Sequence, residues 1–235
     1  MPNRRLLEIL SLIEAAERDR SGPTRLCQVC VDVIGVTGAG IMLMSGDASR
    51  GSACNSDGVS RLIDDVQYTL GEGPSVDAYE QDRPVAEPDL SRRGAERWPG
   101  FTPPAVEAGA RAVFGFPLHV GAVRLGAMSL YQDEPQPLRD SQHADGLLMA
   151  GVAARSVLAM QADAPDGVLG ADLLHGGDLR FVVHQASGMV SVQLGVTITE
   201  ALIRLRAYAF ASECRLVDVA HDVVARRLRF PPALL

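Results

Sequence analysis

Residues 182–228 read VVHQASGMVSVQLGVTITEALIRLRAYAFASECRLVDVAHDVVARRL, and apolar residues recur in this stretch with the spacing of an α-helix. The pattern predicts one helix over about 179–193, one that begins at Thr197, and one over about 216–228. Thr197 and Glu200 have the form of a capping box for the second helix. The C-terminal part of the chain is therefore expected to be a three-helix bundle.

Small residues stand in this stretch where a small bundle more usually has Leu or Ile. They would let the helices approach closely, or leave a flat surface for a partner. The residues are Ala186, Gly188, Ala201, Ala209 and Ala220.

This stretch resembles an ANTAR domain, the RNA-binding module of bacterial transcription antiterminators. The resemblance rests on HQASGMV at 184–190, EA at 200–201, LRAYA at 205–209 and RLVDVA at 215–220. Many members of the family have Lys or Arg between the Ala and the Gly of the first motif, where this chain has Ser187. A phosphate contact at that position is therefore not expected.

The ANTAR resemblance implies that the C-terminal unit binds RNA hairpins with short loops in nascent transcripts. Arginine offers a planar fork to phosphates or base edges, and an aromatic ring can stack on an unpaired base. The candidate RNA-binding residues are Arg204, Arg206, Arg215, Arg226 and Arg227 as cations, Tyr208 as a stacking residue, and Ala186 and Gly188 as motif positions whose alternative role is helix packing. The alternative for Arg206 is an ion pair with Glu200 or Asp218.

Charge is divided unevenly along the chain. The 235 residues carry a formal net charge of −7, and all 22 basic residues are arginines. Residues 178–235 hold seven arginines and five acidic residues, a net charge of +2, which leaves −9 for residues 1–177. An acidic body with a mildly basic end is typical of a sensor joined to a nucleic-acid reader. The absence of lysine argues against a phosphate-accepting receiver domain, which needs a lysine beside its acidic pocket.

The preceding part of the chain predicts an α+β domain. Alternating apolar residues predict a β-hairpin over Ala112–Tyr131. Amphipathic patterns predict helices over about 3–20 and 138–160, the second with Leu147 on its inward face, and residues 89–104 read as a loop. The expected organisation is an antiparallel sheet flanked by helices over 1–163, a linker over 164–177 and the three-helix unit over 178–235.

Two stretches of the N-terminal part resemble a GAF domain, a small-molecule-sensing relative of PAS folds. They are TLGEGPSVDA at 69–78 and the hairpin at 112–131, in which FPL, GAM and LY match the family's apolar strand pair. A GAF domain followed by an ANTAR domain is a familiar arrangement of bacterial regulators. The resemblance implies a sensory domain with a pocket on the helix-covered face of the sheet. The candidate ligand-binding residues, whose alternative role is packing of the core or of a dimer surface, are Leu70, Glu72, Trp98 and Phe101.

Composition predicts a cytoplasmic protein with no membrane span. The longest apolar run, at 146–154, is shorter than the roughly 20 residues that a spanning helix needs. The four cysteines are therefore expected to be thiols. The C-x-x-C pair of Cys27 and Cys30 lacks the second pair that a zinc site would need. Since no set of catalytic residues or metal ligands stands out, we expect no enzyme activity, cofactor or metal.

The sequence thus predicts an RNA-binding antitermination regulator whose N-terminal domain senses a small ligand or a partner. A homodimer is expected, in which the helices at 3–20 and 138–160 form a shared bundle. Two alternatives stay open: a DNA-binding one-component transcription factor, and a sensory protein-interaction module. The last predicted helix carries Asp218 and Asp222, which disfavour a DNA reader because they would face phosphates.

Overall fold

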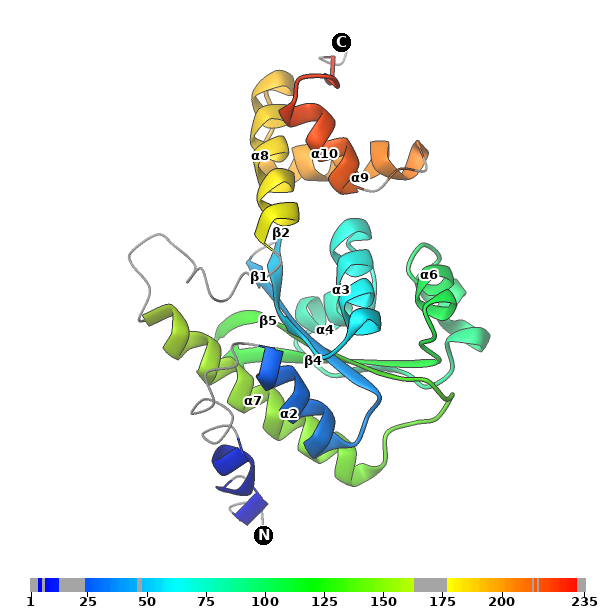
Figure 1. Cartoon of the computed structure of the whole chain (residues 1–235), viewed down its shortest axis with the longest axis vertical. Coiled ribbons are helices and arrows are strands. Elements are labelled where there is room, and N and C mark those ends of the chain that lie inside the picture. Colours follow the sequence, from blue (N-terminus) through cyan, green and yellow to red (C-terminus); the bar gives the residue numbers. More distant parts are fainter. Residues whose placement is uncertain are drawn as a thin grey trace. The chain divides into compact units, whose positions relative to one another are not determined.

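The computed structural model describes residues 4–5, 7–12, 24–45, 48–162, 177–212, 214 and 216–231. The chain divides into two compact units, Met1–His175 and Gly176–Leu235. The first contains an antiparallel sheet with helices, and the described part of the second contains helices without strands (Figure 1). The predicted linker at 164–177 lies, apart from Gly177, outside the described residues.

The first unit is built on a five-stranded antiparallel sheet with the order β2-β1-β5-β4-β3. The strands are β1 (Gly38–Ser45), β2 (Ala48–Asn55), β3 (Val85–Glu87), β4 (Ala112–Val120) and β5 (Val123–Gln132). The predicted hairpin is confirmed, because β4 pairs with β5 and places Phe116 opposite Met128. Pro117 has no amide hydrogen to donate, and it lies beyond Gly115, where the pairing of β4 with β3 ends.

Helices cover both faces of this sheet (Figure 1). They are α2 (Thr24–Ile34), α3 (Gly58–Leu70), α4 (Pro74–Gln81), the π-helix η1 (Leu90–Gly94), α5 (Ala95–Arg97), α6 (Thr102–Glu107) and α7 (Asp140–Ala162). α2 and α7 share one buried core with Phe114 and Phe116 of β4. α3 and α4 share the other core with Val113 of β4 and Ala127 of β5. Neighbouring strand residues enter opposite cores, as the period of two of a β-strand requires.

The inward face of α7 differs from the prediction. Leu147, predicted to face inward, is 48% exposed. Val152, also predicted to face inward, is buried, as are Ala153 and Val157, which the prediction did not place there. Ala150 and Ala154 are also buried in this core. Small side chains allow a helix to approach its neighbour closely, so α7 packs through this face and Leu147 points away from the core.

The predicted loop over 89–104 is largely helical, since η1, α5 and the start of α6 fall within it. The Asp89 carboxylate accepts hydrogen bonds from the N–H of Ser91 at 3.0 Å and from its hydroxyl at 2.6 Å. This cap begins a helical turn despite the nearby Gly and Pro residues. Of the helix predicted over 3–20, residues 4–5 and 7–12 are described and helical.

The second unit consists, in its described part, of three packed helices. They are α8 (Gly177–Leu194), α9 (Ile198–Ala211) and α10 (Leu216–Val224). Ala186, Ala201, Ala209 and Ala220 are all buried, so these four small residues lie inside the bundle, whereas Gly188 is half-buried.

Two helix ends in this unit differ from the prediction. Thr197 Oγ1 accepts a hydrogen bond from the Glu200 N–H at 3.2 Å, but the Glu200 carboxylate pairs with Arg204 at 3.0 Å. α10 ends at Val224 rather than near residue 228. It ends there because Arg226 adopts a left-handed conformation with φ of 60°, which turns the chain out of the helix.

No single helix among those described is long and apolar enough to span a membrane. Val182–Leu194 and Ile198–Ala211 meet the length and composition criteria only as a pair, and they are bent by 104° at the break between them.

Candidate functional site

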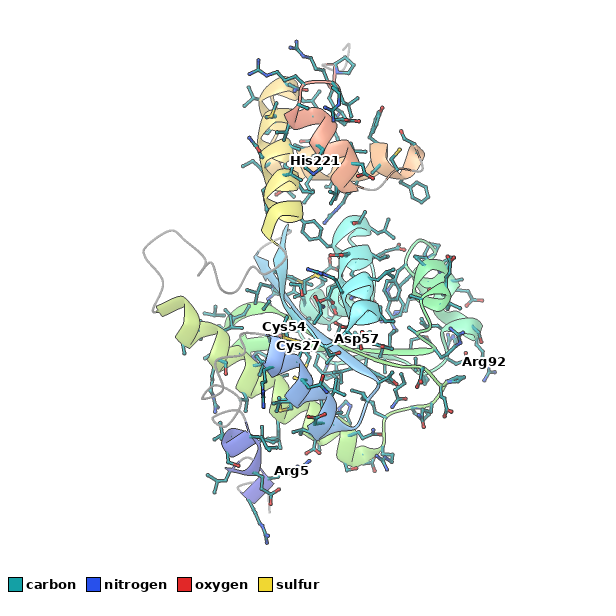
Figure 2. All side chains as sticks on the ribbon, viewed as in Figure 1. Arg5, Cys27, Cys54, Asp57, Arg92 and His221 are labelled. Carbon is teal, nitrogen blue, oxygen red and sulfur yellow. A yellow bond between two sulfur atoms is a disulfide. The ribbon has the colours of Figure 1, made fainter. Side chains whose placement is uncertain are left out.

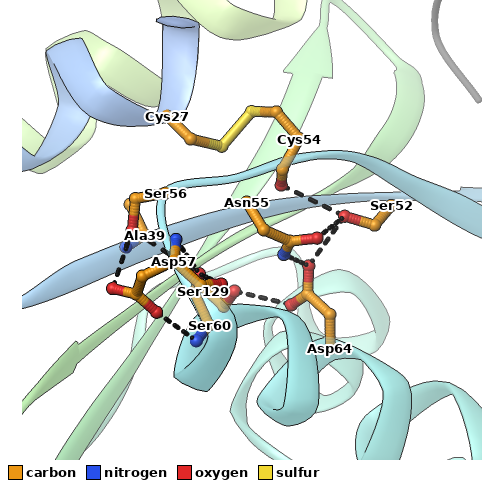
Figure 3. The surroundings of a disulfide bond; sticks show 10 residues. All are labelled: Cys27, Ala39, Ser52, Cys54, Asn55, Ser56, Asp57, Ser60, Asp64 and Ser129. Atoms are coloured by element: carbon orange, nitrogen blue, oxygen red, sulfur yellow. Dashed lines mark hydrogen bonds between the residues drawn. A yellow bond between two sulfur atoms is a disulfide. The ribbon is translucent and has the colours of Figure 1, made fainter. Parts of the chain in front are cut away.

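A disulfide bond joins Cys27 of α2 to Cys54 of β2 (Figures 2 and 3). The expectation of four free thiols is therefore wrong for these two residues. They are 27 positions apart in the sequence, and their Cα atoms lie 5.9 Å apart, within the usual range for a disulfide. The short spacing of Cys27 and Cys30 directs attention to the wrong pair, because the sequence does not show that α2 packs on β2.

Cys30 and Cys214 are the free cysteines. Cys30 is buried in the same core as the disulfide, and burial raises the pKa of its thiol to about 12. A thiol with this pKa stays protonated at neutral pH, whereas attack on a disulfide needs a thiolate. Cys30 is therefore a packing residue. In the described ranges, no group of three His, Cys, Asp or Glu side chains is placed to hold a metal ion.

A buried carboxyl group lies on the side of β2 opposite the disulfide (Figure 3). Asp64 of α3 is fully buried, and its Oδ1 accepts a hydrogen bond from the Ser129 hydroxyl at 2.7 Å. Its Oδ2 accepts from Asn55 Nδ2 at 2.8 Å and lies 3.1 Å from the Ser52 hydroxyl. Gly40 provides the space, because a Cβ there would lie 2.6 Å from Asp64 Oδ2. Partners from β2 and β5 thus offset the cost of burying this group.

Asp57 fixes the start of α3 to the same sheet. Its carboxylate accepts hydrogen bonds from the Ser60 N–H at 2.7 Å and from the Tyr131 hydroxyl at 3.0 Å. Burial raises the pKa of Tyr131, and the Asp57 carboxylate raises it further. The Tyr131 hydroxyl therefore keeps its proton and remains a donor to Asp57 at physiological pH.

The predicted ligand-binding residues lie close together. Glu72 Oε1 accepts hydrogen bonds from the backbone N–H groups of Gly100 and Phe101 at 2.6 and 2.7 Å. A Cβ on Gly100 would lie 2.9 Å from Leu70 Cδ1. Trp98 and Phe101 pack edge to face with ring centroids 5.8 Å apart, and both rings are buried in the core. Glu72 thus ties the turn after α3 to the segment that carries both rings.

Sequence reasoning missed the buried polar residue Gln67, whose partner Ser75 lies in the predicted stretch at 69–78. The Ser75 N–H donates a hydrogen bond to Gln67 Oε1 at 2.7 Å, and both residues are fully buried. Within the part of the chain that the structure describes, Gln67 Nε2 and Ser75 Oγ have no hydrogen-bond partner. An unsatisfied buried polar atom costs about 1–3 kcal/mol, and native proteins contain few of them.

The available signal for these residues was the Gly71-Glu72-Gly73 sequence. Gly71 ends α3 with φ of 69°, and Gly73 has φ of 132°, a value that L side chains rarely adopt. A Cβ on Gly73 would also lie 2.6 Å from Gln67 Cγ. The two glycines therefore form the turn between α3 and α4 and bring the Ser75 N–H to the Gln67 side chain.

The arginines predicted to bind RNA lie in different environments within the second unit. Arg204 pairs with Glu200 at 3.0 Å, and Arg227 pairs with Asp222 at 2.7 Å. Exposed pairs of this kind contribute about 0–1 kcal/mol, so both arginines can exchange their partner for another anion. Arg226 is exposed and Arg206 is half-buried. Arg215 lies outside the described residues.

The remaining candidates in this unit are uncharged. Tyr208 is 40% exposed, and its ring contacts Phe230 with centroids 5.4 Å apart. Gly188 is half-buried, and a Cβ on it would meet nothing within 4 Å. Ala186 is fully buried, a position that suits the packing role rather than direct contact with RNA.

Several solved structures resemble this chain at low sequence identity and with TM-scores below 0.5. The GAF domain of a phosphoenolpyruvate-protein phosphotransferase from Acinetobacter is 12% identical, covering 69% of this chain and 96% of that one, with a TM-score of 0.48. The corresponding domain from Coxiella burnetii is 13% identical, with coverages of 67% and 96% and a TM-score of 0.47. A type II free methionine-R-sulfoxide reductase from Thermoplasma acidophilum is 14% identical, with coverages of 61% and 93% and a TM-score of 0.46.

No model of a known protein family matches the sequence, and no curated protein matches it. Likenesses at these identities and TM-scores assign neither a family nor a function to the chain. The residues themselves define a two-unit protein, an antiparallel sheet covered by helices and a separate three-helix unit.

Proposed function

We propose that this chain is a two-part regulator of transcription that is not an enzyme. Its N-terminal unit is a GAF-like sensor of a small ligand or a partner. Its C-terminal unit is an ANTAR-like module that binds short-loop RNA hairpins in nascent transcripts and so prevents termination. The observation that carries the proposal is the three-helix unit, in which Ala186, Ala201, Ala209 and Ala220 are buried and arginines remain at the surface.

The buried alanines support the RNA-binding part of the proposal through their positions. Ala186, Ala201, Ala209 and Ala220 belong to the four sequence motifs on which the ANTAR resemblance rests, and each is at most 1% exposed. Each of the four motifs therefore contributes a buried alanine to the interior of the three-helix unit, as the resemblance implies.

The surface of this unit supports binding to a polyanion. Arg204, Arg226 and Arg227 are accessible, and the ion pairs that two of them make are exposed. Arginine forks can bind phosphates or base edges without a large desolvation cost at such positions. The net charge of +2 over residues 178–235, against −9 over the preceding residues, favours binding of a polyanion by this unit.

The polar residues between α3 and α4 support the sensor part of the proposal. Gln67 Nε2 is a donor and Ser75 Oγ a donor or acceptor, and the two residues are joined by the hydrogen bond from the Ser75 N–H to Gln67 Oε1. A small polar ligand that bonded to both would remove two desolvation costs. Its binding energy would thus bear on the turn at Gly71 and Gly73, which joins α3 to α4.

Exposed leucines on two helical segments of the N-terminal unit support the expected homodimer. Leu7 of the N-terminal helical segment and Leu147 of α7 are 66% and 48% exposed. Arg5 and Asp145, which pair at 2.9 Å, join these two helical segments within one subunit. Exposed leucines on adjoining helices support a shared bundle with a second copy.

The RNA-binding proposal is tested by titrating the purified full chain against a short-loop RNA hairpin, a duplex DNA of matched length and a scrambled RNA, with one variant and one control. Arg206→Ala is expected to abolish hairpin binding while the far-ultraviolet circular dichroism stays unchanged. Arg155→Ala, the same change at an exposed position of α7, is the control and should bind as the wild type does. Unchanged hairpin affinity for Arg206→Ala would rule out the role of this residue.

The DNA arm addresses the alternative of a DNA-binding transcription factor. α10 exposes Asp218 and His221, and the acidic side chain would face phosphates poorly in a major groove. Preferential binding to the duplex DNA would overturn the RNA proposal. Absence of binding to every nucleic acid, including by residues 177–235 alone, would favour the protein-interaction module.

A further inference from the structure

The segment after α10 folds back onto the other two helices of the second unit. The Phe230 N–H donates a hydrogen bond to the side-chain oxygen of Gln193, close to the end of α8, at 2.9 Å. The Phe230 ring meets the Tyr208 ring of α9 at an angle of 65°, with centroids 5.4 Å apart. A backbone hydrogen bond and a ring contact therefore fix Phe230 against both α8 and α9.

Both rings remain accessible from outside. Tyr208 is 40% exposed and Phe230 is half-buried. An edge-to-face pair leaves ring faces uncovered by the partner ring. The two side chains thus form a small aromatic surface whose geometry is set before any ligand arrives.

Arginines flank these rings, and two of them make exposed ion pairs, Arg204 with Glu200 and Arg227 with Asp222. Arg204 precedes Tyr208 by one helical turn, so the two side chains lie on the same face of α9. Residues 225–231, which carry Phe230, contain no acidic residue. The exposed arginines in that segment are Arg226, Arg227 and Arg229.

We propose that Tyr208 and Phe230 form a stacking platform for an unpaired base in the loop of the hairpin RNA, with the arginines of residues 225–231 on the flanking phosphates. This inference rests on the RNA-binding function proposed above. It adds Phe230, Gln193 and Arg229 to the RNA-binding surface, none of which belongs to the motifs that suggested it. Bases stack on aromatic rings whatever their sequence, and neighbouring cations neutralise the phosphates beside a stacked base.

The occupant is a single-stranded loop rather than a stem. A ring pair can take a base only where the base is unpaired and splayed out, and the deep groove of an RNA helix does not admit side chains. The other exposed aromatic residue of α9, Phe210, is 70% exposed and two positions from Tyr208. Two residues correspond to about 200° around a helix, so Phe210 lies away from the platform and serves as a matched control.

The test compares the full-length wild type with Phe230→Ala, Phe230→Leu and Phe210→Ala. The probe is an RNA hairpin whose short loop carries 2-aminopurine. The reference is a two-stranded RNA duplex with the sequence of the stem and no loop. Phe230→Ala is expected to weaken hairpin binding by about 5- to 150-fold, the range given by loss of one aromatic stacking contact. Phe230→Leu, which keeps apolar bulk against Tyr208, should also lose the change in 2-aminopurine fluorescence. Phe210→Ala should leave both readouts unchanged.

The outcomes separate the platform from the function on which it rests. Hairpin binding by the wild type together with full affinity and full fluorescence change in both Phe230 variants would overturn the platform and leave the RNA-binding function standing. An equal loss in Phe210→Ala would also overturn it, since any exposed apolar ring would then suffice. A wild type that binds no hairpin would overturn both. Circular dichroism of each variant establishes that the helices are intact, and Phe230→Leu alone decides between these outcomes if Phe230→Ala fails to fold.

Discussion

Reducing the disulfide between Cys27 and Cys54 is expected to lower the free energy of unfolding of the N-terminal unit by about 3.5 kcal/mol. The bond closes a loop with a sequence separation of 27. The chain-entropy relation for a loop of that length gives about 12 cal/mol/K of denatured-state entropy, or about 3.5 kcal/mol at 25 °C. This is a large share of the roughly 5–15 kcal/mol that stabilises a typical domain.

The assay is urea unfolding of the full chain with and without a phosphine reductant, followed by tryptophan fluorescence. Trp98 is the only tryptophan, lies in the N-terminal unit and is 2% exposed, so its emission reports on this unit alone. With a slope of about 1–3 kcal/mol/M in urea, the midpoint should fall by roughly 1–3.5 M. Cys54→Ala should show a low midpoint that the reductant does not change, and Cys214→Ser should behave as the wild type.

Two results would refute this reasoning. One is a reductant-independent midpoint in the wild type with an unchanged slope. The other is alkylation of all four cysteines in protein unfolded without reductant, because that would show four thiols where the structure has two.

The remaining predictions concern buried groups of the same unit. Asp64→Ala should lower the free energy of unfolding of the unit by about 2–5 kcal/mol, because it leaves the Ser129 hydroxyl and the Asn55 amide without their acceptor. Asp65→Ala, at an exposed neighbouring position of α3, should change the free energy of unfolding reported by Trp98 by less than about 1 kcal/mol. Equal effects of the two substitutions would contradict the hydrogen-bond network. Since the pKa of the Cys30 thiol is raised from 9.0 to about 12, the unfolded chain loses this proton first as the pH rises, and stability should fall between about pH 9 and 12. Cys30→Ala should make that part of the urea-midpoint profile less steep, with a remaining slope from Tyr131, whose pKa is also raised; an identical profile in the variant would refute the assignment.

How far the sequence predicts the fold depends on the range of the interactions involved. The hairpin of β4 and β5 follows from local alternation, and the three helices of the second unit follow from local spacing. The disulfide does not, because it needs the tertiary packing of α2 on β2. The exposure of Leu147 was missed for a similar reason: periodicity gives two or three possible faces of a helix, and the partner surface selects one.

The candidate sites show the same division. Glu72 was found because it stands between two glycines, and its contact with the Phe101 N–H places it beside the predicted rings. Ser75 lies in the stretch at 69–78, but Gln67 belongs to no motif, and only the fold of the turn at Gly71 and Gly73 brings the two together. Phe230 lies beyond the last predicted apolar stripe, so no periodicity could have placed its ring on Tyr208.

Edge strand β2 explains why the disulfide and the buried carboxyl group occur together. β2 pairs only with β1, and its sequence, ASRGSACN, has few side chains able to bury apolar surface. Cys54 ties one face of the strand to α2, while Asn55 ties the other face to Asp64 of α3 (Figure 3). A covalent bond and a polar network thus replace the apolar packing and the second neighbouring strand that β2 lacks. When the disulfide is reduced, amide hydrogen exchange should therefore rise first in β2, and exchange in the β4–β5 hairpin, which lies in the interior of the sheet, should rise only with global unfolding.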